Sequence, residues 1–222
     1  MWRAAPIVCA LWIHDIGAGY PHWMSTCVSV IGPAKGDSAA LDSAISAALA
    51  DANVRQVIYL GDDDAARNVV ERILATGIAP SNFLSHAVDA AVRGDASQIR
   101  ALLNDEARGR RLAAVRSLPA PPARAIELLD RWVLLAVHDK AVLDEDDIAN
   151  AQVILYGKSE GPTLKRFGQH FFFSPGSLTD GCTGMLIHRD DGSLVLELRD
   201  LSGAIQRTET LTAGSSKFRV KP

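Results

Sequence analysis

The sequence predicts an α/β protein in which strands and helices pack in layers. In the first half, short apolar runs that end at Gly or Asp alternate with segments whose apolar residues recur at helical spacing. In the last third, three segments alternate like antiparallel strands, at 184–187, 194–198 and 205–211, with a hairpin turn at Asp190-Asp191-Gly192.

The first half predicts three strands and two helices. A buried strand is expected at 27–31, where CVSVI runs into Gly32-Pro33, and a helix over 38–50. A second strand at 57–60 ends at Gly61-Asp62, and a second helix covers 65–76. The apolar piece at 87–92 is expected as a third strand, which ends at Arg93-Gly94-Asp95.

The second half continues this alternation after a break. A charged helix over 99–111 is followed by a proline-rich stretch at 118–122. Apolar strands are then expected at 132–137, 153–156 and 171–173, and an acidic helix start at 144–147. These strands end at His138-Asp139, at Gly157-Lys158-Ser159-Glu160 and at Ser174-Pro175-Gly176-Ser177 respectively.

Composition excludes several classes of protein. A chain of 222 residues with 48% hydrophobic and 22% charged residues is typical of one packed globular domain. The formal net charge of -3 gives no electrostatic basis for binding nucleic acid or an anionic membrane. Three cysteines without a CxxC pair argue against a zinc ribbon and favour a reducing, cytoplasmic location.

The predicted domain spans 25–212, between an N-terminal extension at 1–24 and a C-terminal tail at 213–222. The apolar run at 4–13 is too short to cross a bilayer. It lacks the cleavage signal of a secretory leader, so an extension is favoured, while secretion by residues 1–23 stays an alternative.

Polar clusters follow five of the predicted strands, and ligands of α/β sheets bind at the carboxyl ends of strands. In their order and spacing these clusters resemble the motifs of the calcineurin-like metallophosphoesterases, especially the small bacterial phosphodiesterases. The resemblance covers roughly 25–211. It implies a sandwich of two sheets flanked by helices, with two metal ions at the strand ends.

The resemblance also implies which residues occupy the metal-ligand positions. Asp62 matches the bridging aspartate, Asp95 the asparagine of the third motif, and His138 the fourth-strand histidine. The first motif falls on Pro33 and Lys35, and the last pair of histidines on Lys158 and Glu160. The turn that follows in the family reads Ser174-Pro175-Gly176-Ser177 here.

These replacements imply that one of the two metal sites is lost. Pro33, Lys35, Asp62 and Glu160 would supply two carboxylates and an ammonium group, which repels a cation. The other site would retain Asp62, Asp95 and His138, which suits one Mn, Fe or Zn ion. Alternatively, Lys35 and Lys158 neutralise these carboxylates without metal, or both are ordinary surface lysines.

Three functions follow as hypotheses. The favoured one is a catalytically inactive metallophosphoesterase-like protein that serves as a binding or interaction module, because two-metal hydrolysis requires both cations. The second is a weakly active one-metal phosphodiesterase or phosphatase that uses Asp62, Asp95 and His138. The third is a phosphate- or nucleotide-binding protein in which Lys35 and Lys158 replace the metals. The expected partner is a protein or a phosphate-containing ligand.

Overall fold

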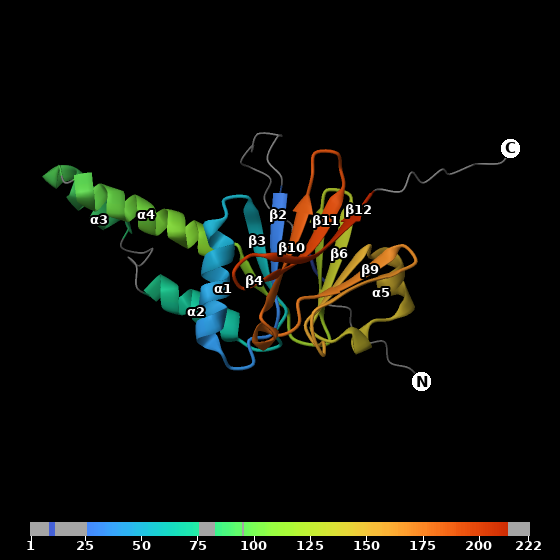
Figure 1. Ribbon diagram of the computed structural model, residues 1–222. Coiled ribbons are helices and arrows are strands. Elements are labelled where there is room, and N and C mark those ends of the chain that lie inside the picture. The colour runs from blue at the N-terminus through green and yellow to red at the C-terminus, as the bar shows by residue number, and fades with distance from the viewer. Residues whose placement is uncertain (1–8, 12–25, 76–82, 95, 213–222) are drawn as a thin grey trace.

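The computed structural model describes residues 9–11, 26–75, 83–94 and 96–212. It contains two six-stranded sheets packed face to face (Figure 1). Sheet A has the strand order β1 (Cys9–Leu11), β5 (Arg124–Leu129), β6 (Trp132–Val137), β7 (Val153–Tyr156), β9 (His170–Ser174), β8 (Thr163–Phe167). Sheet B has the order β12 (Ile205–Leu211), β11 (Leu194–Asp200), β10 (Cys182–His188), β2 (Thr26–Ile31), β3 (Val54–Tyr59), β4 (Val115–Ser117).

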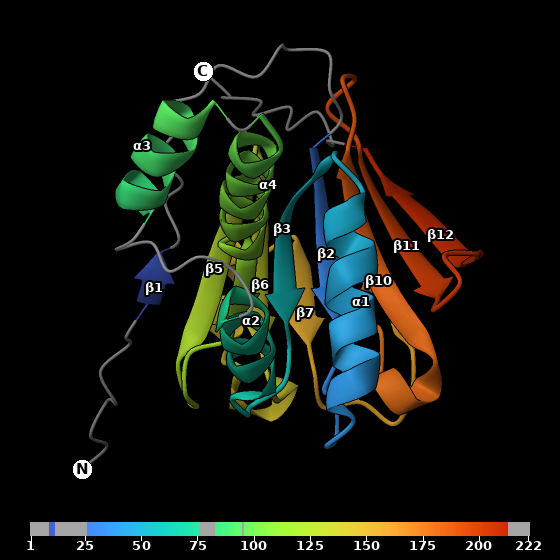
Figure 2. The ribbon, with the colours of Figure 1, turned by 90° about the vertical axis from the view of Figure 1, so that its left-hand side faces the viewer.

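Helices lie outside the sheets. They are α1 (Ser38–Ala50), α2 (Ala65–Ala75), α3 (Phe83–Arg93), α4 (Ala96–Leu112) and α5 (Glu145–Asn150). Figure 2 shows α1, α2 and α4 in front of sheet B, while Figure 1 shows α3 and much of α4 projecting beyond the sheets. Across the residues that the structure describes, no helix has the length and apolar composition needed to cross a bilayer.

The layered α/β fold and the two-sheet sandwich flanked by helices are therefore confirmed. The pairing within each sheet is mixed: β2, β3 and β4 are parallel, as are β6, β7 and β9, whereas β10, β11 and β12 are antiparallel. Three residues of the predicted extension, Cys9–Leu11, pair with β5 in sheet A.

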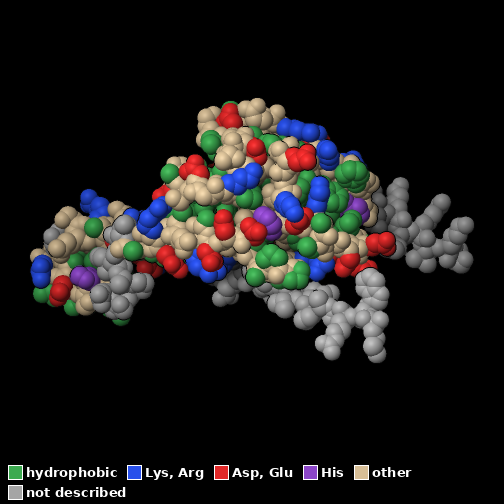
Figure 3. All heavy atoms as spheres, turned by 90° about the horizontal axis from the view of Figure 1, so that it is seen from below, with side chains coloured by type: hydrophobic (Ala, Val, Ile, Leu, Met, Phe, Trp, Pro, Cys, Tyr) green, Lys and Arg blue, Asp and Glu red, His purple; other side chains and the backbone are tan. Residues whose placement is uncertain are grey.

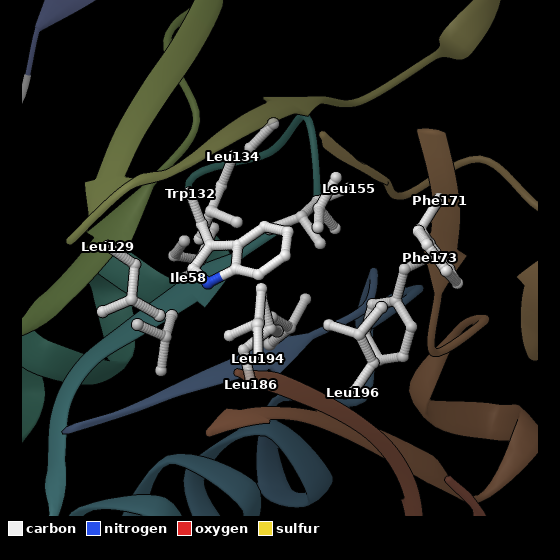
Figure 4. Packing of buried hydrophobic residues seen from close by; sticks show 14 of the residues in the cluster. Ile58, Leu129, Trp132, Leu134, Leu155, Phe171, Phe173, Leu186, Leu194 and Leu196 are labelled. Atoms are coloured by element: carbon white, nitrogen blue, oxygen red, sulfur yellow. The ribbon is translucent and has the colours of Figure 1, made fainter. Parts of the chain in front are cut away.

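The main core lies between the two sheets. Inward-facing residues of both sheets meet there, among them Trp132, Leu155, Phe173, Leu186 and Leu196 (Figure 4). Burying such large apolar side chains is the dominant favourable contribution to folding. A second cluster lies under α1 and α2, on the outer face of sheet B. The two clusters hold the strand ends of both sheets in fixed positions.

Helix α1 is fixed at both ends by polar contacts. The Asp37 side chain caps its start by accepting a hydrogen bond from the backbone N–H of Ala40 at 2.9 Å. At its other end, the Arg111 guanidinium from α4 donates to the carbonyl oxygens of Leu49, Asp51 and Val54, at 2.6, 2.8 and 2.9 Å. Arg111 thereby joins the base of α4 to the turn between α1 and β3.

The predicted strand at 87–92 is wrong, because those residues belong to α3. The strand that lies next to β3 is instead β4, which follows the helical excursion and pairs with β3 from Val57↔Val115 to Tyr59↔Ser117. Ala90 is buried, and Phe83 and Ala87 on the same face are half-buried, so the apolar residues of α3 follow a helical rather than a strand period.

Candidate functional site

The loops that follow β2, β3, β6 and β7 meet at one end of the sandwich, together with the turn after β9. Their main chains touch. A Cβ atom added at Gly32 would lie 1.6 Å from the Gly176 carbonyl oxygen, and one added at Gly157 would lie 2.1 Å from the Leu60 carbonyl oxygen. These loops therefore require glycine at both positions, and they form one continuous surface, on which acidic and basic side chains are intermixed (Figure 3).

Tyr59 ties two of these loops together from below. Its hydroxyl group accepts a hydrogen bond from the Ala34 backbone N–H at 3.0 Å and donates one to the Asp63 carboxylate at 2.8 Å. The same Asp63 oxygen accepts from the N–H of Ala65 at the start of α2. Burial and the nearby carboxylates raise the pKa of Tyr59 well above its ordinary value, so the hydroxyl keeps its proton.

Asp62 and His138 come together at the centre of the surface. Nδ1 of His138 lies 2.9 Å from the Leu60 carbonyl oxygen, and Nε2 lies 3.5 Å from the Asp62 carboxylate. A carbonyl oxygen only accepts hydrogen bonds, so Nδ1 carries a proton and a neutral His138 has its lone pair on Nε2. The Asp62 side chain is 55% exposed and that of His138 is 19% exposed, so this pair faces solvent.

Lys158 forms an ion pair with Asp139, a partner that the sequence did not predict. Its ammonium group donates to the Asp139 carboxylate at 2.6 Å, and its side chain is 68% exposed. This hydrogen bond lowers the pKa of Asp139 and raises the pKa of Lys158. The negative charge of Asp62 raises the pKa of Lys158 further, by a smaller amount. Lys158 therefore does not neutralise Asp62 as a buried lysine would. It forms an exposed ion pair with Asp139, next to Asp62.

Lys35 and Glu160 are not joined to this pair. Lys35 is exposed in the loop before α1, with a positive φ of 50°. Glu160 is exposed on the wall of a broad groove of about 950 Å³, which Lys158, Tyr156 and Lys165 also line. Among the described residues, no ion pair links either side chain to Asp62. The idea that Lys35 neutralises Asp62 and Glu160 therefore finds no contact to support it.

Asp95 lies outside the described residues. Its neighbours, Gly94 and Ala96, end the turn after α3 and begin α4, so the strand end on which its assignment rested does not exist. At the corresponding place in the sheet, β4 ends at Ser117 and the half-buried Leu118 follows, which packs against the main core. This strand end offers no carboxylate to the surface.

The turn after β9 has a structural role. Ser174 accepts a hydrogen bond from the N–H of Gly176 at 3.1 Å, and Gly176 has a φ of 75°. The Ser177 hydroxyl donates to Asp180 at 2.8 Å and lies 2.7 Å from the hydroxyl of Thr179. These contacts occupy the polar atoms of the turn and fix its backbone against Gly32.

The donor set is small for a metal centre. Within the described ranges, no group of three or more His, Cys, Asp or Glu side chains is placed to hold a metal ion. Asp62 and His138 supply two donors, whereas a catalytic zinc ion takes three protein ligands. An ammonium group stands at position 158, next to this pair.

Comparisons with known proteins give the fold. No protein-family profile and no curated protein matches the sequence. A predicted phosphoesterase from Streptococcus pneumoniae TIGR4 is structurally similar, with a TM-score of 0.52 and 13% identity over 85% of this chain and 98% of that chain. The phosphoesterase YfcE from E. coli gives 0.51 and 16%, over 84% and 100%. Vacuolar Protein Sorting 29 from Cryptosporidium parvum gives 0.51 and 12%, over 86% and 100%.

Proposed function

We propose that this chain, whose fold is that of the calcineurin-like metallophosphoesterases, is a binding or interaction module that does not carry out two-metal hydrolysis. The observation that supports this most is the composition of the site surface. Of the positions at which the family carries metal ligands, those brought together here are Asp62, His138 and Lys158. Two donors beside an ammonium group give no basis for binding two cations.

The loops nevertheless keep the close approach that such a site needs. Gly32 contacts Gly176, Gly157 contacts Leu60, and Tyr59 bridges two loops, so the backbone beneath the surface is held in place. A fixed surface that keeps only two of the family's metal ligands is suited to recognising a partner. The same fold is found in a protein named for vacuolar sorting as well as in phosphoesterases, which is consistent with this use.

The test is hydrolysis of bis-p-nitrophenyl phosphate with added Mn²⁺. We expect the purified protein to be no faster than its Asp62→Ala variant, because Asp62 bridges the two ions in the family and has nothing to bridge here. A Mn²⁺-dependent rate that clearly exceeds that of Asp62→Ala would contradict the proposal. His138→Ala, which removes the other donor, distinguishes a rate that arises at this site from one caused by a contaminating enzyme.

A one-metal hydrolase is the second candidate, and the tautomer of His138 favours it. The hydrogen bond from Nδ1 to the Leu60 carbonyl directs the lone pair of Nε2 toward Asp62, which is the usual arrangement of a histidine that binds metal. Asp62, His138 and solvent would then hold one Mn, Fe or Zn ion. With its strand end absent, Asp95 is no longer supported as the third ligand of this set.

Metal titration by calorimetry separates these two candidates. We expect the wild-type protein to bind Mn²⁺ weakly or not at all, and Lys158→His to bind it measurably tighter, because the change removes a repelling charge and adds a donor. Lys165→His is the matched control, since Lys165 lies in the groove away from Asp62. Tight binding by the wild-type protein would favour the one-metal hydrolase. Equal binding by all three proteins would show that position 158 does not face the metal position.

The third hypothesis, phosphate binding by Lys35 and Lys158, has less support. Lys158 is already bonded to Asp139, and Lys35 is exposed on a neighbouring loop. A phosphate group would have to displace Asp139 from Lys158. Titration with inorganic phosphate tests this, and a loss of binding in Lys158→Met would favour it.

A further inference from the structure

The two sheets end in four edge strands within the part of the chain that the structure describes. Sheet A ends at β1 and β8, and sheet B ends at β12 and β4. β1 and β4 have three residues each, β8 has five and β12 has seven. Figure 2 shows β12 as the outermost strand on its side of the molecule. An edge strand presents unpaired backbone N–H and C=O groups, which another strand can pair with.

β12 has only part of the protection that edge strands usually carry, namely a β-bulge at one end and the charges of Arg207 and Glu209. Its sequence, IQRTETL, contains no proline, glycine or lysine. Five of its seven residues are exposed, at 205–208 and 210, and Glu209 is half-buried. Its far end is held in place, because Leu211 is buried in the core between the sheets. A β-bulge disturbs the pairing with β11 near Gln206 and leaves the register regular from Arg207 to Leu211. The central part of β12 is therefore an ordered strand with an open edge.

The charges on β12 are arranged so that the strand is complementary to itself. Arg207 and Glu209 lie on the same face, since they are two residues apart and their side chains approach to 3.3 Å. In an antiparallel pair with a twofold axis at Thr208, Arg207 lies opposite Glu209 of the second copy, and Glu209 opposite Arg207 of that copy. Both cross-strand pairs join opposite charges, which stabilises an antiparallel sheet.

We propose that β12 pairs with β12 of a second copy of this chain, antiparallel and around a twofold axis at Thr208, so that the B sheets of the two copies form one continuous sheet. A closed twofold dimer is the commonest form of homo-oligomer, and a surface that is complementary to itself is what its symmetry requires. The pairing also covers both open edges at once.

The other long edge does not fit this arrangement. β8 carries Lys165 and Arg166, both exposed, and among its five residues there is no acidic side chain. A twofold antiparallel pair centred on Lys165 would place two ammonium groups opposite each other, which is destabilising. The charge pattern thus selects β12 as the edge that accepts a second copy.

The test uses charge reversal, with sedimentation velocity as the measurement. We expect the wild-type protein to form dimers at high micromolar concentration. Arg207→Glu and Glu209→Arg should each weaken self-association about tenfold or more, because two attractive pairs become repulsive in each variant. Arg67→Glu is the matched control, since Arg67 is also an exposed arginine in an ion pair, on α2, and this variant should dimerise like the wild type.

Mixing the two variants gives the decisive result. Chains with glutamate at 207 and 209 should pair with chains that carry arginine at both positions, so an equimolar mixture should restore dimers, now mixed ones. The double variant Arg207→Glu/Glu209→Arg should restore self-association. A wild-type protein that stays monomeric, single variants that dimerise like the wild type, or a mixture that stays monomeric would each overturn the proposal. Restoration in the mixture also proves that both variants are folded.

Discussion

The backbone frame of the site and the side chains at its tips are built under different constraints. The frame is buried: the main chains of Gly32 and Gly176 touch, and Tyr59 is completely enclosed beneath the loops. The tips are exposed, as Lys35 and Lys158 show. Replacing an exposed side chain at a loop tip leaves the packing of the frame unchanged. Replacing Gly32 by a larger residue would force its loop and that of Gly176 apart. Side chains at the tips of these loops can therefore be replaced while the backbone beneath them keeps its shape.

The largest effect is expected from Gly32→Ala, which would break the frame. The new methyl group would lie 1.6 Å from the Gly176 carbonyl oxygen, and a backbone atom cannot move aside as a flexible side chain can. We expect a loss of about 3 kcal/mol or more in the free energy of unfolding, as for severe overpacking. Urea unfolding measures it. The control is Gly161→Ala, where a methyl group would meet no atom within 4 Å, and which should change stability by less than about 0.5 kcal/mol.

A smaller loss is expected from Tyr59→Phe. Without the hydroxyl group, the N–H of Ala34 loses its acceptor and Asp63 loses a donor. Leaving a buried donor without a partner costs about 1–3 kcal/mol, again measurable by urea unfolding. Tyr156→Phe removes a hydroxyl for which the described contacts include no hydrogen bond, and it should be close to neutral. Equal stability of both variants would show that the bridge between the loops contributes nothing.

The smallest effect is expected at the tip, from Lys158→Met. The thermal unfolding curve at neutral pH should shift only slightly, because the ion pair with Asp139 is exposed. The pKa of Asp139, measured by NMR, should rise toward its ordinary range, since the hydrogen bond from Lys158 is the main cause of its lowering. Lys140→Met, which removes the lysine stacked on Tyr156, is the control and should shift that pKa less.

The direction of the pH dependence follows from this lowered pKa. A carboxyl group whose pKa falls on folding stabilises the fold fully above its ordinary pKa, and that contribution is lost as the pH drops through the lowered value. The wild-type protein should therefore lose slightly more stability in acid than Lys158→Met does. A pKa of Asp139 that is the same in both proteins would contradict the ion pair.

Most of the fold could be predicted from the sequence because its segments carry clear periods and caps. The helix predicted at 38–50 has the bounds of α1, and the structure adds that the Asp37 side chain caps its start. The segment 87–92 could not be assigned correctly, because a short apolar run fits a buried strand as well as one face of a helix. In the structure this segment is a helix that packs against α4, and a local sequence pattern does not reveal such a tertiary contact.

The site could be predicted less well than the fold. The order of strands was sufficient to expect Asp62 and His138 at one edge, and the structure brings them to 3.5 Å. The partner of Lys158 could not be predicted, since an exposed lysine reaches several carboxylates and Asp139 is one residue away from the expected His138. Tyr59 gave no local signal either, because it is an ordinary aromatic residue at the end of a buried strand.

Arg111 links the exchange behaviour of two segments that are far apart in the sequence. Three carbonyl oxygens, at the end of α1, in the turn after it and at the first residue of β3, accept hydrogen bonds from this guanidinium group of α4. Amide protons exchange with solvent when a segment opens as a cooperative unit. Opening α4 removes the donor from these carbonyls, so we expect the last turn of α1 and the base of α4 to open as one such unit. The protection of amides around 47–54 should therefore report on whether the helical excursion between β3 and β4 is docked.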